Sequence, residues 1–160
     1  MAVDMFLKLD GIKGESVDHK HSEEINVLAW SWGVSNSGSA HMGAGAGSGK
    51  VNVQDLSITK YIEKSSTDLM LAACSGKHIP SALLTVRKAG EKPLEYLKIK
   101  LTDVLISSVS SGGSGGEDRL TENISLNFSK VEVEYTPQKK DGSGDKTMTM
   151  GWDIAKNVKA

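Results

Sequence analysis

The sequence predicts a mainly β fold with one short α-helix, and three observations carry that prediction. Most of the chain alternates apolar and polar residues with a period of two, which is typical of half-buried strands. One segment, Leu69–Cys74, is instead continuously apolar and is bounded by helix start and stop residues. Two glycine-rich segments, Gly43–Gly49 and Ser110–Gly116, separate strand patterns without a change in composition, so they indicate loops of special shape inside one domain. We expect residues 1–160 to form that single domain, since 160 residues suffice to bury a core.

The composition excludes several classes of protein. Hydrophobic residues make up 38% of the chain and aromatic residues only 5%, which predicts an aliphatic core. The 19 basic and 20 acidic residues give a net charge of -1, so the clustered basic surface of a nucleic-acid-binding protein is not expected. The single cysteine, Cys74, excludes an internal disulfide framework.

The N-terminal residues bear on localisation. They carry Asp4 and Asp10 and lack the apolar segment of a secretory signal peptide. No run approaches the roughly 18 apolar residues that a membrane span requires. We therefore expect a protein that folds in the cytoplasm, does not insert into a membrane, and is exported by a machine that reads no N-terminal signal.

The strand over Ile25–Gly33 has two different faces. Strand side chains alternate between the two sides of a sheet, so Ala29 and Ser31 must point away from Trp30 and Trp32. We expect the indoles, together with Leu28, to face the core. The small residues are then left for an exposed surface.

The remaining strands are predicted from the same alternation. Their expected ranges are Phe6–Asp10, Val51–Ile62 with a bend near Gln54–Asp55, Leu83–Arg87, Leu94–Val109, Ile124–Tyr135 and Thr147–Ile154. Within Ile124–Tyr135 the apolar residues change parity at Ser129–Lys130. Either the strand bulges there or its two halves bury opposite faces, as happens where a strand passes between the two sheets of a barrel.

The predicted helix is unusual because its body is apolar on every side. Ser65 is expected to cap it with Asp68 as the capping-box partner, and Gly76–Lys77 supplies the stop. A helix that is apolar all round is buried all round. A small β domain can hardly cover such a helix with its own chain, so we expect a neighbouring subunit to cover part of it.

No candidate motif indicates an enzyme. The loop over Gly43–Lys50 fails as a phosphate-binding loop, because Ala44 replaces the first glycine and Val51 the hydroxyl residue, and Ser48 breaks the dinucleotide-binding pattern. His19 and His21 are too few for a metal site and are interpreted as surface histidines. Cys74 is interpreted as a small buried hydrophobic residue.

The remaining acidic and aromatic candidates also have structural interpretations. We interpret Glu117, Asp118 and Glu122 as parts of a local turn held by salt bridges to Arg119, in preference to an acid pair for glycoside chemistry. The paired tryptophans, Trp30 and Trp32, are more typical of a core than of a carbohydrate platform. We therefore predict no catalytic residue, no metal and no cofactor.

Four segments together resemble the haemolysin-coregulated protein family, the tube subunits of bacterial type VI secretion systems. The resemblance extends from Met1–Phe6 to Gly151–Ile154 and is poorest over Pro137–Lys146. Its specific feature is the combination of the Trp-Ser-Trp strand with the glycine-plus-acidic block. The four segments are Val27–Gly33 (VLAWSWG), Gly49–Asp55 (GKVNVQD), Ser57–Tyr61 (SITKY) and Gly112–Asn123 (GGSGGEDRLTEN).

The resemblance implies a two-sheet β-barrel with one flanking helix, similar to bacteriophage tail-tube proteins. It further implies homohexameric rings that stack into a hollow tube, a contractile sheath that expels the tube, a spike protein at its tip, and small effector proteins bound and protected inside the ring. The candidate sites are Ala29 and Ser31 toward the lumen and effector, the loop glycines Gly43, Gly45, Gly47 and Gly49 between subunits or rings, and Leu69, Met70 and Ala73 at an interface. The alternative is a monomeric β-sandwich that serves as a binding or adhesin-like module.

Overall fold

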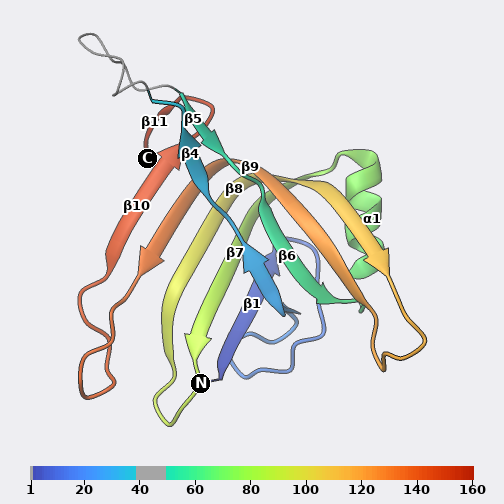
Figure 1. Cartoon of the computed structure of the whole chain (residues 1–160), viewed down its shortest axis with the longest axis horizontal. Helices are drawn as coiled ribbons and strands as arrows, with labels where there is room; N and C mark the ends of the chain where they lie inside the picture. Colours follow the sequence, from blue (N-terminus) through green and yellow to red (C-terminus); the bar gives the residue numbers. More distant parts are fainter. Residues whose placement is uncertain (1, 39–49) are drawn as a thin grey trace.

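The computed structural model describes residues 2–38 and 50–160, which form eleven strands and one helix (Figure 1). The expected helix and strand patterns are present, with bounds that shift by several residues. The elements are β1 (Val3–Leu9), β2 (Ile25–Asn26), β3 (Ala29–Ser31), β4 (Val34–Asn36), β5 (Val51–Val53), β6 (Leu56–Tyr61), α1 (Ser66–Ser75), β7 (His78–Lys88), β8 (Leu94–Gly112), β9 (Thr121–Tyr135), β10 (Met148–Asp153) and β11 (Val158–Lys159).

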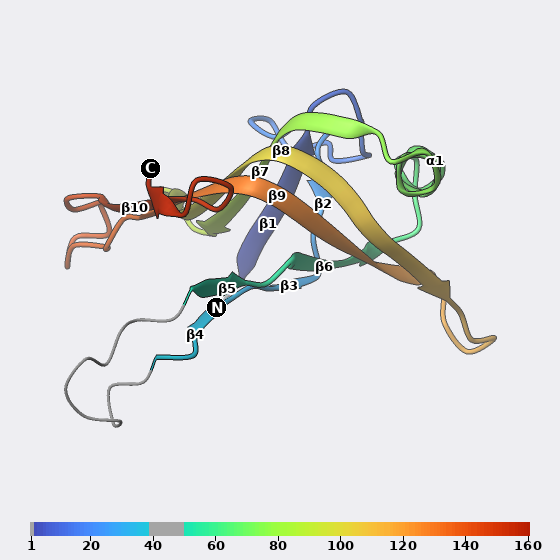
Figure 2. The ribbon, with the colours of Figure 1, turned by 90° about the horizontal axis from the view of Figure 1, so that it is seen from above.

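The strands form one long antiparallel sheet and a separate two-stranded hairpin. In the long sheet the order is β11-β10-β9-β8-β7-β1-β2, while β6 pairs with β9 and β3 pairs with β6. The hairpin consists of β4 and β5. Figure 2 shows the sheet folded over on itself, with β3 and β6 on one side, β7 and β8 on the other, and β1 and β2 between them.

Residues 2–38 and 50–160 do not form the closed barrel that we expected, because the strand predicted over Ile25–Gly33 breaks at Val27–Leu28. The Val27 N–H donates to the Met5 carbonyl of β1 at 3.0 Å, whereas the Leu28 N–H donates to the Thr59 carbonyl of β6 at 2.8 Å. The chain therefore leaves one partner strand and joins another between two consecutive residues. As a result, β2 pairs only with β1 and β3 only with β6, so the described sheet stays open at this point.

The parity change predicted in β9 coincides with a change of partner. The first half of β9 pairs with β6 and its second half pairs with β10, while β8 runs along both. Buried residues take even positions up to Phe128, whereas beyond it Val131 is buried and Val133 is half-buried, both at odd positions. The β8–β9 register is the same on either side of Ser129, at Thr102↔Lys130 and at Val104↔Phe128, so no residue is inserted there. The two halves therefore bury opposite faces.

The core is aliphatic, as the composition predicts. Three half-buried tryptophans, Trp30, Trp32 and Trp152, pack against its margin, while its centre consists mainly of leucine, isoleucine and valine. The largest fully buried apolar side chains are Leu7, Ile25, Leu56, Ile58, Leu69, Ile79, Leu84, Ile99, Leu101, Ile124 and Leu126.

The helix α1 lies beside β8 at one side of the sheet (Figure 1). The helix ends at the predicted C-cap: Gly76 has a left-handed φ of 68° and donates its N–H to the Ala72 carbonyl at 3.0 Å. The predicted capping box is wrong. The Ser65 hydroxyl donates to the Glu63 carboxylate in the preceding turn, so it makes no cap bond to the helix.

The prediction that α1 is buried on every side is also wrong within this chain. Leu69 and Ala72 are buried in the core. Met70 and Leu71 are 39% and 67% exposed. Cys74, predicted to be buried, is exposed. Among the described residues the helix has one buried side and one exposed apolar side, because the sheet packs against it mainly along β8.

Candidate functional site

The candidate site is one face of a four-stranded layer that is formed by β3, β6, the first half of β9 and the second half of β8. Residues paired across adjacent strands point to the same side of a sheet. The pairing therefore builds two rows of side chains, which we call the polar face. They are Ser31–Ser57–Ser125–Ser108 and Ala29–Thr59–Asn123–Ser110.

The polar face carries hydroxyl, amide and methyl groups, and none of its eight side chains is ionisable. Ala29 and Ser31 are exposed, as the alternation predicts. The Thr59 hydroxyl donates to the Asn123 side-chain oxygen at 2.7 Å, which joins two strands across the surface. Such a face offers hydrogen bonds without charge or acid–base chemistry.

The opposite side of the same layer is the core. Trp30, which lies between Ala29 and Ser31, is half-buried and packs against the core. Its partner Ile58 is 1% exposed, and the next residue in that row, Ile124, is fully buried. The small residues and the indole are therefore separated onto two faces.

The layer ends in two strand edges that lack a partner strand among the described residues. On one side β3 pairs only with β6. On the other side the pairing of β7 with β8 ends at His78↔Leu105, so the stretch of β8 from Ile106 to Gly112 pairs only with β9. Unpaired edges are templates for pairing with another chain.

A buried ionic network lies behind the polar face, at the start of α1. Lys60 donates to Glu122 across β6 and β9, and both side chains are fully buried. The Ser66 hydroxyl donates to the same Glu122 oxygen at 2.7 Å, and the Ser111 hydroxyl donates to the other at 3.2 Å. Burial by itself raises the pKa of the Glu122 carboxyl, but the hydrogen bonds from Lys60 and Ser66 and the charge of Lys60 outweigh it and lower the pKa.

This network corrects our interpretation of the acidic turn. Among the described residues, the ion pairs include no contact of Arg119 with Glu117, Asp118 or Glu122. The Arg119 guanidinium instead lies over the Tyr61 ring, 3.8 Å from its centroid. The sequence did contain a signal for the buried pair, since Lys60 and Glu122 occupy the core-facing parity of their strands.

The glycine block before this turn is less constrained than expected. An added Cβ at Gly112, Gly115 or Gly116 would meet nothing within 4 Å. Only Gly113 would clash, with the Leu120 side chain at 2.5 Å. Close packing of this block against its own chain is therefore limited to one residue.

His21 is buried, not a surface histidine as we predicted. Its Nδ1 lies 2.9 Å from Glu24, and its Nε2 lies 2.7 Å from Glu95. Its ring stacks on Phe6 with centroids 4.3 Å apart. The sequence alone could not place Glu95, which is far away along the chain, next to this ring.

A second ionic cluster holds the same segment. Arg87 donates to Asp18 at 2.6 Å and to Asp4 at 3.1 Å. The hydrogen bond from Arg87 holds the pKa of the Asp18 carboxyl well below its usual range, and the bond to Asp18 raises the pKa of Arg87. Both clusters tie residues 14–24 to β1, β7 and β8 and serve structure.

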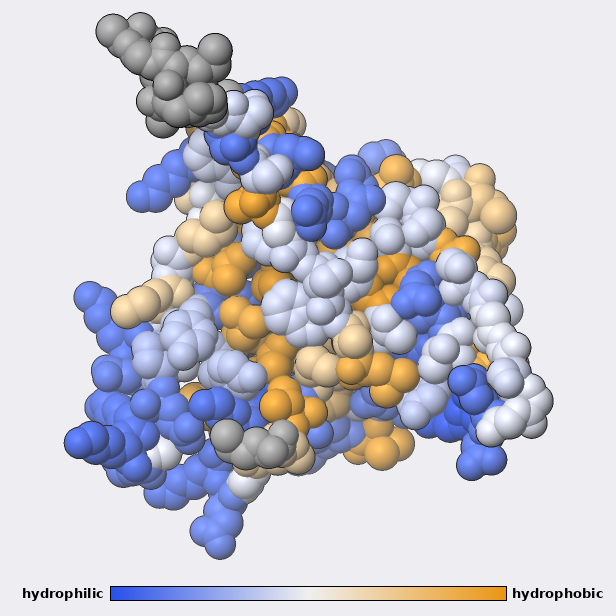
Figure 3. Space-filling view, in the orientation of Figure 1, coloured by the Kyte–Doolittle hydropathy of each residue, from blue (hydrophilic) through white to orange (hydrophobic). Residues whose placement is uncertain are grey.

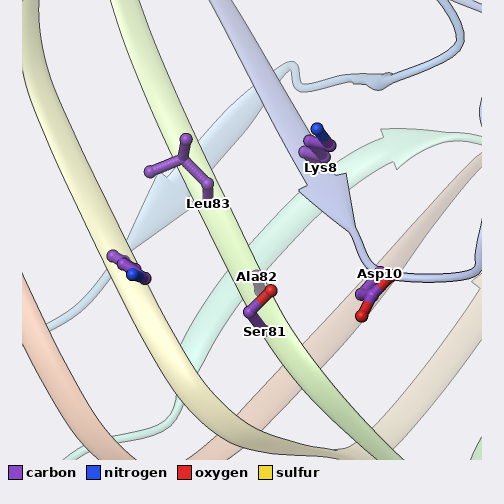
Figure 4. A pocket seen from close by; sticks show the side chains of 6 residues that line it. Lys8, Asp10, Ser81, Ala82 and Leu83 are labelled. Carbon is purple, nitrogen blue, oxygen red and sulfur yellow. The ribbon is translucent and has the colours of Figure 1, made fainter.

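A different face of the sheet is charged. Lys8, Leu83 and Lys100 lie in one cross-strand row over β1, β7 and β8. They line a shallow hollow of about 430 Å³ together with Asp10, Ser81 and Ala82 (Figure 4). This charged, open surface contrasts with the uncharged polar face.

The other predicted site residues fall in different places. Gly43, Gly45, Gly47 and Gly49 lie outside the described residues. Of the three residues predicted at an interface, Leu69 is fully buried inside its own chain, so its side chain is not available to another subunit. Met70 is exposed and Ala73 is half-buried. Within residues 2–38 and 50–160, no group of three or more acidic, histidine or cysteine side chains is arranged to hold a metal ion.

Known proteins resemble this chain closely in sequence and in structure. Residues 6–135 match the family described as "Type VI secretion system effector, Hcp". Protein hcp1 of Pseudomonas aeruginosa is 65% identical over 162 residues, covering 100% of both chains. The crystal structure of Hcp1 from Salmonella typhimurium has a TM-score of 0.83 at 43% identity, covering 100% of both chains. A solved type six secretion system protein has a TM-score of 0.94 at 33% identity, covering 99% of this chain and 100% of that chain.

These matches define a secreted component of a type VI secretion system. The chain belongs to the Hcp family, the haemolysin-coregulated proteins, which confirms the resemblance found in the sequence. The family consists of structural, secreted proteins. In the described part of the chain, no helix has the length and apolar character to cross a membrane.

Proposed function

We propose that this chain is a structural subunit of the type VI secretion inner tube and assembles as homohexameric rings that stack into a hollow tube. The observation that carries the proposal is the four-stranded layer, which has an uncharged polar face and two edges that lack a partner strand among the described residues. Membership of the Hcp family supports the same function.

The two edges suit ring formation because they lie on opposite sides of the layer. Pairing of β3 in one subunit with Ile106–Gly112 of the next subunit's β8 satisfies both edges at once. Such an interface joins two different surfaces, and a heterologous interface generates a ring when its rotation closes. In that ring the sheet continues from subunit to subunit, as in a closed barrel.

The polar face would then line the bore. Its small side chains leave room, and its hydroxyl and amide groups can hydrogen-bond a small effector protein, so the ring serves as carrier and chaperone. Within it we assign Ala29 and Ser31 to effector contact. The sheath and the spike tip protein are the other proposed partners, and the assembled tube is expelled from the cell.

The loop over Gly43–Gly49 is proposed to contact another subunit or ring through its backbone. Its small residues suit close approach. Shortening the loop should weaken stacking while the melting temperature of the subunit stays within a few degrees. Tight ATP binding in calorimetry would instead show that the loop serves a ligand.

A solution mass measurement tests the proposal. At tens of micromolar we expect the mass of six subunits, and negative-stain images should show rings. A monomeric mass at that concentration would overturn the proposal in favour of a monomeric binding or adhesin-like module.

Effector binding has a separate test. A co-expressed type VI effector should co-purify with the parent ring and be lost from Ser31→Gln, because a bulky amide crowds the bore at every subunit. Ser22→Gln, an exposed serine outside the polar face, is the matched control and should retain the effector. Equal retention by both variants would remove Ser31 from the contact surface.

A further inference from the structure

The uncovered side of α1 is an apolar stripe that its own chain leaves exposed. Cys74 follows Met70 by four residues and Leu71 by three, so the three side chains lie on one side of the helix. All three are exposed, and Leu71 is 67% exposed. The surface over α1 accordingly carries tan and orange residues in Figure 3.

The helix lies on the core side of the four-stranded layer, beside its unpaired β8 edge. Leu69 and Ala72 belong to the core that backs the layer. The Ser66 hydroxyl donates a hydrogen bond to the Glu122 carboxylate. The Glu122 side chain points to the core side, whereas the side chain of its neighbour Asn123 lies on the polar face. α1 packs on β8, and Ser66 of the helix and Ser111 of β8 both donate to the Glu122 carboxylate, so the helix stands behind the edge formed by Ile106–Gly112.

The other end of the layer presents an exposed apolar residue on the same side. Val34 follows β3 and is 51% exposed. It pairs with Val53, which packs against the core, so Val34 also points to the core side. Figures 1 and 2 both place β4 and α1 at opposite sides of the chain.

We propose that the α1 stripe of one subunit packs against Val34 on the β3–β4 segment of the next. This inference rests on the proposed ring. When β3 of a neighbour pairs with the β8 edge, the layer continues into that neighbour. The core side of the neighbour's β3–β4 segment then faces α1, because α1 stands behind the same edge. The contact joins an apolar surface of one subunit to an apolar surface of the next. Each subunit therefore uses two different patches, the α1 stripe and Val34, as the heterologous interface of a closed ring requires.

The chain provides a direct test, because Cys74 is its only cysteine. In Val34→Cys, mild oxidation or a short bismaleimide should join residue 34 of one subunit to Cys74 of the next. A ladder of covalent multimers is expected on a non-reducing gel. Parent protein and Val34→Cys/Cys74→Ser each place one thiol at this contact and should give no ladder.

A matched variant tests the competing surface. Val158→Cys places a thiol on β11, at a valine that is 48% exposed. A ladder with Val158→Cys and none with Val34→Cys would overturn the inference and assign the stripe to the β10–β11 region.

Solution mass separates this inference from the proposed function. Rings without a Val34→Cys ladder would leave the tube proposal standing and refute the α1 contact. A monomeric mass would refute both.

Discussion

Lys60 and Glu122 form an ion pair between β6 and β9 in which neither side chain is exposed to solvent. Ser66 at the start of α1 donates to the same carboxylate oxygen. The pair therefore fastens the helix to the back of the layer that we propose as the lumen wall. Because α1 has only one buried side, this attachment fixes where its exposed stripe is presented.

Removing one partner of this pair should be costly. Lys60→Met leaves Glu122 as an uncompensated buried charge, which typically costs about 3–5 kcal/mol of unfolding free energy. Replacing both residues, as in Lys60→Met/Glu122→Leu, should recover most of that loss because no buried charge remains. Urea unfolding followed by circular dichroism measures both variants. A double variant as unstable as the single one would show that the network stabilises through its hydrogen bonds and not through charge pairing.

The same pair predicts a loss of stability in acid. The pKa of Glu122 in the folded state lies below its ordinary value of 4.5, so its contribution is fully present above that pH. It is lost as the pH falls through the folded-state pKa. The gap in urea midpoint between the parent and Glu122→Gln should therefore be widest above pH 4.5 and narrow at lower pH. A gap that stays constant with pH would contradict the lowered pKa.

Asp103 is the point in β8 where the buried face changes, and its backbone predicts which substitutions it tolerates. Its φ is 53°, and its carboxylate accepts a hydrogen bond from Ser129 at 3.1 Å. Asp103→Val should cost about 1–2 kcal/mol, because a β-branched residue is strained in the left-handed region. Asp103→Asn keeps an acceptor and tolerates this φ, so its thermal unfolding should match that of the parent. Equal destabilisation by both would assign the role to the charge.

The local pattern of the sequence was sufficient to predict most strands, because alternation depends only on neighbouring residues. It assigned the two faces of β3 at Trp30 and Ser31, and it located the face change in β9 near Ser129. It also predicted the end of α1 at Gly76, because a left-handed glycine is a local feature.

What could not be predicted depends on partners that are distant in sequence. The sheet of the described residues stays open because the N–H groups of Val27 and Leu28 donate to different strands, and no local pattern encodes that choice. His21 is buried because Glu95, 74 residues away, reaches its ring. The sequence of α1 resembles that of a core helix, although one side of the helix is exposed. A sequence cannot say whether its own chain or another chain covers an apolar surface.

The orientation of β3 gives a last prediction, since Trp30 and Ser31 are neighbours on opposite faces. Trp30 packs against the core but is only half-buried, so Trp30→Ala should cost about 3 kcal/mol, at the lower end of the range for emptying an aromatic site. Ser31 is exposed, so Ser31→Gln should stay within about 0.5 kcal/mol of the parent. Urea unfolding of the two variants makes the comparison. A stable Trp30→Ala beside a destabilised Ser31→Gln would mean that the indole faces outward and the serine inward, which would remove Ser31 from the proposed bore.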